Sequence, residues 1–310
     1  MIVSMENDYT KRLKDILVSS GWTQEELAYQ LGVSFVTVNT WIRGKAEPRV
    51  EMRRRIDDLY LGIIGREEIS AEFLENAKAL AYKKRMRVQE ILGDEQMLDK
   101  LVLNWTYHTN TIEGSTMTMD DVQAVLADEV LVNKTAREQA EARNHRAAVY
   151  YLLDLLARGG GEFKWTKEII LQTHLRLMNT IVTSAGQYRE HGVRIMGSGV
   201  TVVNYLKVPD LMERIIRDLN SPSDDLLEKM ARLHARFEQI HPFADGNGRT
   251  GRLILMVQAL AEGMVPPVVV KERKRAYYEA IRKAQMYQEN EFLVAFLAES
   301  VLAGERILRK

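Results

Sequence analysis

The 310-residue chain contains no cysteine. This absence excludes disulfide bonds, thiolate catalysis, and zinc or iron–sulfur sites with cysteine ligands. The His-Glu-x-x-His pattern of zinc proteases is also absent, so we do not expect a metal site built from histidines. A chain without cysteine fits a reducing compartment.

Long apolar runs and an excess of charge are absent as well. No stretch reaches the roughly 18 apolar residues of a membrane helix, and the start, MIVSMENDYT, has no basic-then-apolar signal peptide. We therefore expect a cytoplasmic protein without membrane contact. Because 43 basic residues balance 43 acidic ones, nothing global attracts the chain to nucleic acid, and any basic surface must be local.

Proline is scarce, with six in the chain and none between Pro48 and Pro209. That interval is rich in Ala, Leu, Glu, Lys and Arg, which favours helix throughout. The length and the 46% apolar content predict two domains with a sizeable core. The fold class is therefore mainly α, with one long surface helix expected over residues 67–92.

One segment, residues 241–252 (HPFADGNGRTGR), combines residue types that few structural needs require together. Apolar residues at helical spacing precede it over 226–240, and a nearly continuous apolar run follows over 253–260, a buried helix that Pro266-Pro267 should end. The segment is thus the crossing between two helices. Its glycines let the backbone approach a ligand closely, and the first turn of the second helix offers N–H groups to an anion.

The side chains of this crossing suit phosphate chemistry. Asp245 is a hard oxygen ligand that could hold Mg²⁺, while Arg249 and Arg252, one turn apart, could grip phosphates. His241 can take a proton near neutral pH. Together these are the parts needed for a hydroxyl to attack a nucleotide phosphate.

The segment resembles the signature of the Fic family, His-Pro-Phe-x-(Asp/Glu)-Gly-Asn-Gly-Arg-x-x-Arg, with every fixed position filled. The resemblance implies transfer of AMP from ATP to a hydroxyl side chain of a target protein. It implies that His241 is the general base and that Asp245 carries Mg²⁺ or Mn²⁺. The anion-binding and phosphate-binding residues it implies are Gly246, Asn247, Gly248, Arg249 and Arg252.

A second motif, residues 109–114 (TNTIEG), lies at the end of a helix expected over about 94–114. It resembles the inhibitory motif (Ser/Thr)-x-x-x-Glu-(Gly/Asn) of Fic proteins that carry an N-terminal inhibitory helix. A carboxylate at Glu113 that reached Arg252 would occupy the guanidinium needed by the γ-phosphate. The alternative is that Glu113 merely ends a helix.

Residues 191–204 carry the only convincing hairpin pattern, with β-branched runs on either side of Gly-Ser-Gly. The Fic resemblance places a flap here. An exposed strand edge would dock a target segment through main-chain hydrogen bonds.

The N-terminal residues 1–60 predict a compact set of short helices. Thr23 is a good N-cap with Glu26 three residues later, Gly32 is a stop, and a second helix follows from Ser34. The spacing resembles the lambda-repressor type of helix-turn-helix. That resemblance implies DNA binding by the second helix.

We name Thr37, Thr40, Arg43 and Lys45 as candidate DNA contacts. The helix begins with Phe35-Val36, which could touch thymine methyl groups or could dock a protein instead. Both readings stay open.

The resulting expectation is a helix-turn-helix domain (1–60) followed by a Fic domain (66–310) that adenylylates an unknown protein, including itself, under inhibition by Glu113. Three alternatives remain: removal of AMP with the help of Glu113, phosphate transfer as in the Doc branch, and a DNA-binding regulator whose Fic domain senses nucleotide. A homodimer is also open, since Fic proteins of this class are often dimeric.

Overall fold

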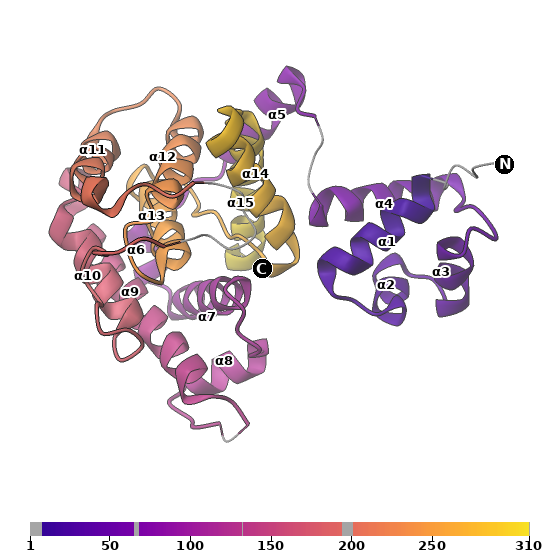
Figure 1. Ribbon diagram of the computed structural model, residues 1–310, viewed down its shortest axis with the longest axis horizontal. Coiled ribbons are helices and arrows are strands. Elements are labelled where there is room, and N and C mark those ends of the chain that lie inside the picture. Colours follow the sequence, from indigo (N-terminus) through magenta and orange to yellow (C-terminus); the bar gives the residue numbers. More distant parts are fainter. Residues whose placement is uncertain (1–7, 65–67, 132, 194–200, 310) are drawn as a thin grey trace. The chain divides into compact units, whose positions relative to one another are not determined.

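The computed structural model describes residues 8–64, 68–131, 133–193 and 201–309, and this part of the chain is mainly helical (Figure 1). No strand is assigned within those ranges, where extended pairing is limited to an isolated antiparallel bridge between Arg85 and Met264. The mainly α prediction is confirmed. The expected hairpin falls largely on residues 194–200, outside the described ranges, and its described flanks form no strand.

The chain divides into two compact units, residues 1–68 with 272–280 and residues 69–271 with 281–310. The helices of the N-terminal part of the first unit are α1 (Asp8–Ser20), α2 (Gln24–Leu31), α3 (Phe35–Ile42) and α4 (Val50–Ile63). Thr23 and Glu26 form the expected capping box of α2. Gly32 ends α2 at φ 68°, where glycine is favoured.

These four helices enclose their own small core. Leu13, Ile16, Leu27, Val38 and Ile56 are fully buried within it. The α2–turn–α3 arrangement predicted from the sequence is therefore formed and packed within a folded unit. Helix α4 continues past residue 60 to Ile63.

The second unit contains the remaining helices. They are α5 (Ala71–Tyr82), α6 (Val88–Leu92), α7 (Glu95–Ile112), α8 (Met119–Leu126), α9 (Ala136–Gly159), α10 (Lys167–Met178), α11 (Val208–Asn220), α12 (Leu226–Ile240), α13 (Asn247–Ala261) and α15 (Glu291–Arg309), while α14 (Lys274–Tyr287) spans the division between the units. Short 3-10 turns cover Gly160–Glu162, Tyr205–Lys207 and Lys271–Arg273.

Helix α13 is the centre of the second unit (Figure 1), and almost every residue from Asn247 to Leu260 is buried. It packs against α7, α9, α10 and α12. An apolar helix of this kind needs partners on all sides, which explains why these four helices surround it. Its N-terminal end therefore lies where several helices converge.

The prediction of one long helix over residues 67–92 is wrong. Helix α5 ends at Tyr82, and the chain becomes extended because Met86 N–H donates to Gly263 O (3.0 Å) and Val265 N–H donates to Lys84 O (3.0 Å). This pairing with a distant segment overrides the local helical preference. The stop of α13 also differs from expectation, since the helix ends at Ala261, before Gly263 (φ 66°) and well before the two prolines.

Candidate active site

The crossing between α12 and α13 begins with a strained residue. His241 ends α12 in the left-handed region (φ 49°), which is uncommon for a residue other than glycine and costs about 1 kcal/mol or more. Buried Arg189 holds this backbone: its Nε donates to His241 O (2.7 Å), one Nη donates to Ile240 O (3.3 Å), and its N–H donates to Pro242 O (2.9 Å). Arg189 was not identified from the sequence, because nothing local marks it.

The His241 side chain has a defined tautomer. Its Nδ1 lies 3.2 Å from the carbonyl oxygen of Glu238. A carbonyl can only accept, so Nδ1 carries the proton and Nε2 presents a lone pair. Burial lowers the pKa of His241, with the backbone of Glu238 opposing this shift. The ring is thus neutral near pH 7 and able to accept a proton.

The rest of the loop is fixed by its own polar groups. The Asn247 amide accepts from Phe243 N–H and donates to Phe243 O, both at 2.9 Å. Phe243 stacks on His174, with 3.7 Å between ring centroids. His174 accepts from Gly186 N–H at Nδ1 and donates from Nε2 to Asp245 O, each at 2.9 Å. The Asn247 side chain is therefore engaged within the loop, and only its backbone N–H can face an anion.

Asp245 reaches outward from the start of α13, with its side chain 40% exposed. One oxygen accepts from Gly246 N–H (2.6 Å) and lies near Arg249 (3.3 Å), and the other accepts from Arg137 (2.8 Å). Burial raises the pKa of Asp245, but Arg249, Gly246 N–H and Arg137 together lower it below its usual value. The carboxylate is therefore ionised. In the described ranges no three histidines or carboxylates, those around Asp245 included, are grouped so that they could hold a metal ion by themselves.

Arg249 lies almost fully inside the protein, with a side chain only 4% exposed. Its Nη1 is 3.1 Å from Glu141 on α9, which also pairs with Arg137 (3.1 Å). Sequence reasoning did not identify Arg137 or Glu141. Their spacing of four residues is typical of an exposed helix face, so it gave no signal.

Arg252 and Glu113 meet as predicted, although 139 residues separate them. Arg252 Nη2 donates to a Glu113 carboxylate oxygen (2.5 Å), and its Nε donates to the Thr109 hydroxyl (2.5 Å). Both acceptors come from the last turn of α7, where Glu113 is the C-cap. Gly114 follows at φ 107°, a conformation that favours glycine.

Gly248 shows where the Glu113 carboxylate lies. A Cβ at this glycine would stand 2.4 Å from Glu113 Oε1 and 3.0 Å from Arg252 Nη1. The carboxylate therefore presses against the first turn of α13. No side chain caps this helix, so the backbone N–H groups of its first turn face the same space.

A buried acid lies behind Arg252. Burial raises the pKa of Glu238 to about 8, with Arg252 opposing the shift and Glu113 adding to it. Its Oε1 would be 2.7 Å from a Cβ at Gly251, and His234 Cε1 would be 2.9 Å from that Cβ. The close packing of Glu238 and His234 explains why residue 251 is glycine. No sequence pattern pointed to Glu238.

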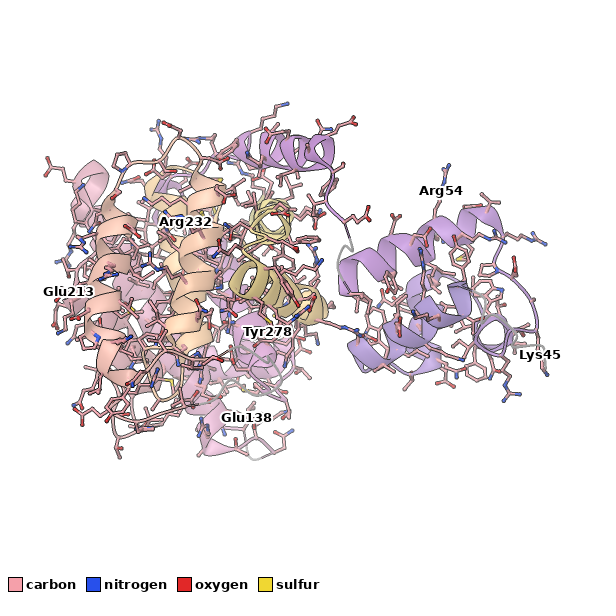
Figure 2. All side chains as sticks on the ribbon, turned by 45° about the horizontal axis from the view of Figure 1, so that its top comes forward. Lys45, Arg54, Glu138, Glu213, Arg232 and Tyr278 are labelled. Carbon is pink, nitrogen blue, oxygen red and sulfur yellow. The ribbon has the colours of Figure 1, made fainter. Side chains whose placement is uncertain are left out.

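The candidate DNA contacts lie on α3 and the turn after it. The Thr37 hydroxyl bonds to that of Ser34 (2.8 Å), and Thr40 donates to Val36 O (2.7 Å). Arg43 and Lys45 are exposed. Figure 2 shows Lys45 extending away from its unit, as does Arg54.

Two segments of the chain match models of known protein families. Residues 164–259 match the model of the Fic/DOC family, and residues 13–60 match a helix-turn-helix model. The chain is similar to protein adenylyltransferase fic-1 of Caenorhabditis elegans (29% identity over 197 residues, 62% of this chain and 38% of that protein). It is also similar to fic-1 of Caenorhabditis briggsae (27% over 265 residues, 84% and 48%). The chain thus spans less than half the length of these curated relatives.

Solved structures share the fold. Fic-1 from C. elegans superposes with a TM-score of 0.65 at 24% identity, covering 84% of this chain and 76% of that one. A Fic-domain signalling protein from Bacteroides thetaiotaomicron superposes with a TM-score of 0.64 at 18% identity, covering 76% and 97%. No helix in the described ranges combines the length and apolar character that a membrane span requires.

The buried histidines predict acid sensitivity of the folded state. Burial lowers the pKa of His108 and His174 to about 4 and that of His145 and His234 to about 3. Between pH 6.5 and those values these histidines are protonated in the unfolded chain and neutral in the folded chain. Each such histidine then destabilises the fold by about 1.4 kcal/mol per pH unit.

We therefore expect the free energy of unfolding in urea to fall steadily from pH 6.5 to pH 5, because these four histidines outweigh Glu238, whose raised pKa acts in the opposite direction over the same range. His191, whose side chain is exposed, is the control, since its replacement by alanine should leave the slope unchanged. A stability that is flat from pH 7.5 to pH 5 would contradict this description of the interior.

Proposed function

Because residues 164–259 form a Fic/DOC domain and residues 13–60 a helix-turn-helix, we propose that this protein transfers AMP from ATP to a hydroxyl side chain of a target protein. The names of its relatives, protein adenylyltransferases, support this reaction. The supporting geometry is the convergence at the start of α13, where a neutral imidazole, an outward carboxylate and two guanidiniums surround uncapped N–H groups.

The start of α13 supplies the anion site. Backbone N–H groups of Asn247 and Gly248 and the positive end of the helix dipole favour phosphate oxygens. Arg252 adds a guanidinium that can hold two oxygens at once. Because the backbone donors are fixed in place before the nucleotide arrives, they stabilise developing charge without reorganising.

His241 is the proposed general base. The target hydroxyl attacks the α-phosphorus, a new O–P bond forms, the bond to the β-phosphate oxygen breaks, and pyrophosphate leaves with the electron pair. The hydroxyl proton goes to His241 Nε2, whose lone pair is available because Nδ1–H is held by Glu238 O. The left-handed backbone of His241, locked by Arg189, sets the direction of the ring.

Asp245 fits a divalent cation of the magnesium type. Its carboxylate is ionised and partly exposed at the edge of the anion site, and Mg²⁺ is commonly bound by one or two carboxylates together with substrate phosphates. When bound, Mg²⁺ or Mn²⁺ would neutralise charge on the phosphates. Arg137, 2.8 Å from the same carboxylate, holds its orientation.

Glu113 is the proposed inhibitor of this reaction. Its carboxylate occupies Arg252 and the space beside Gly248, where the γ-phosphate would otherwise lie. The phosphates of an ATP molecule that binds here are repelled by the negative charge of Glu113. They also cannot bind the guanidinium of Arg252, which Glu113 already occupies. Its α-phosphate is then held out of line with the attacking hydroxyl.

The first test is labelling of lysate proteins with α-³²P-ATP. We expect Glu113→Gly to increase label over the wild type by roughly ten- to a hundredfold, the range implied by a charge-assisted hydrogen bond. Adding His241→Ala should abolish the gain, because this variant lacks the imidazole that takes the proton. Glu129→Gly, which removes an exposed loop carboxylate, is the matched control and should stay at the wild-type level.

Two results would contradict the proposal. Equal label in the wild type and Glu113→Gly would exclude inhibition by Glu113, and strong label in the double variant would exclude His241 as base. If no variant incorporates label, a target protein that carries labelled AMP should be incubated with the wild type and with Glu113→Gly. Loss of label with the wild type alone would assign Glu113 to removal of AMP.

The helix-turn-helix supports a second role, and we propose that it binds DNA through α3. The local basic side chains support this, because Arg43, Lys45, Arg49 and Arg54 are exposed around the end of α3 and the start of α4. The hydroxyls of Thr37 and Thr40 bond within their own helix. Phe35 and Val36, 43% and 70% exposed, are left as apolar contacts for base edges.

Selection from a random duplex library should therefore enrich a defined sequence. Lys45→Ala should reduce the slope of log affinity against log salt by about one, as expected for one lost phosphate contact. Lys11→Ala, an equal loss of charge at an exposed residue of α1, should leave the slope unchanged. No enriched DNA would remove this role and favour protein docking by Phe35 and Val36.

A further inference from the structure

Two glycines one turn apart on α13 each leave room for a carboxylate. At Gly248 a Cβ would collide with the carboxylate of Glu113, and at Gly251 it would lie 2.7 Å from Oε1 of Glu238. Positions three residues apart lie on one face of a helix, with about 5–6 Å between their Cβ atoms. Glu113, at the end of α7, and Glu238, on α12, therefore both reach the stretch of α13 that carries Arg252.

The surroundings of these two carboxyl groups differ. The Glu113 side chain is 30% exposed and contacts the Arg252 guanidinium directly (2.5 Å). Glu238 is 9% exposed, and its Oε1 is buried without a hydrogen-bond partner. A charged oxygen without a donor is costly in the interior, so burial favours the neutral acid and raises the pKa of Glu238 to about 8. At pH 7 Arg252 is thus close to one ionised carboxylate and one uncharged acid.

Two charges oppose each other at Glu238. Arg252 lowers the pKa of Glu238, against the effect of burial, and Glu113 raises it further. His234, four residues earlier on α12, packs with Glu238 against Gly251 and is neutral, because burial lowers the pKa of its imidazole to about 3. Helices α11 and α15 also pack on α12, but in the described part of the chain the charges that act on Glu238 come from α7 and α13. The protonation of Glu238 is therefore coupled to the anion that Arg252 holds.

We propose that Glu238 is a positioning residue for the anion at Arg252: as a neutral acid it leaves the guanidinium charge to that anion, and as a carboxylate it competes for that charge. The anion is Glu113 in the inhibited protein and the γ-phosphate of ATP during AMP transfer, a second case that rests on the proposed function. Either anion opposes ionisation of Glu238, because like charges disfavour each other. By linkage, an anion with this effect binds Arg252 with uptake of a proton and binds more weakly as the pH rises.

The first test uses no nucleotide and follows the side-chain carboxyl carbon of Glu238 by ¹³C NMR in the full-length chain. The glutamate resonance that is missing from Glu238→Gln identifies this residue. We expect it to titrate near pH 8 in the wild type and at a lower pH in Glu113→Gly, because the negative charge of Glu113 is gone. Equal midpoints in the two proteins, or a wild-type midpoint below pH 5, would overturn the proposal.

The second test measures the affinities of Glu113→Gly for ATP and ADP between pH 6.5 and pH 9 with saturating Mg²⁺. ATP should lose at least about threefold in affinity relative to ADP, since a pKa raised by one unit allows a tenfold loss at most. Adding Glu238→Gln should make the ratio of the two affinities independent of pH, because an amide does not ionise. A constant ratio in Glu113→Gly, or an equal fall in the double variant, would overturn the proposal.

Glu228→Gln, also added to Glu113→Gly, is the matched control. Glu228 is a partly buried acid on the same helix, and burial raises its pKa as well. It lies ten residues before Glu238, about 15 Å along α12, so its replacement should leave the pH dependence of the ratio unchanged. A ratio that no longer depends on pH in this control would contradict the assignment to Glu238.

Together the two tests separate the role of Glu238 from AMP transfer itself. If neither nucleotide binds but the Glu238 midpoint falls on removal of Glu113, the proposed AMP transfer is wrong and the coupling of Glu238 to the anion at Arg252 is confirmed. If Glu113→Gly labels proteins as proposed but the midpoint does not move, AMP transfer is retained and the role of Glu238 is wrong.

Discussion

The buried guanidinium of Arg252 is the constraint on which the arrangement of the second unit depends. A charge that is only 5% exposed must be compensated by acceptors, or the cost of removing it from water would destabilise the fold. The last turn of α7 provides two of them, the Thr109 hydroxyl and the Glu113 carboxylate. The contact that compensates this charge therefore also fixes α7 beside the start of α13.

The same constraint gives a physical reason for the proposed inhibition. A guanidinium placed to receive a phosphate has to be neutralised when no nucleotide is bound, and Glu113 supplies the negative charge. The close approach of its carboxylate to Gly248 means that carboxylate and phosphate would compete for one space. Inhibition would then be an exchange of one anion for another.

Much of this site could be predicted because its residues lie in two short motifs. The helix over residues 94–114 and the crossing at 241–252 form as expected, and Glu113 and Arg252 meet. The supporting groups could not be found in this way. Arg189 and Glu141 act from separate elements, and the break after Tyr82 arises from pairing with a segment about 180 residues away. Such contacts have no local pattern, whereas caps and apolar spacing do.

The central claim, that Glu113 occupies the place of the γ-phosphate, is tested most directly by comparing affinities for ATP and ADP in the presence of Mg²⁺. In the wild type the γ-phosphate finds Arg252 occupied, so the two dissociation constants should be nearly equal. In Glu113→Gly, ATP should bind at least tenfold more tightly than ADP, since a phosphate bound by a buried guanidinium contributes at least about 1.4 kcal/mol. The same ADP-to-ATP ratio in both proteins would contradict the account.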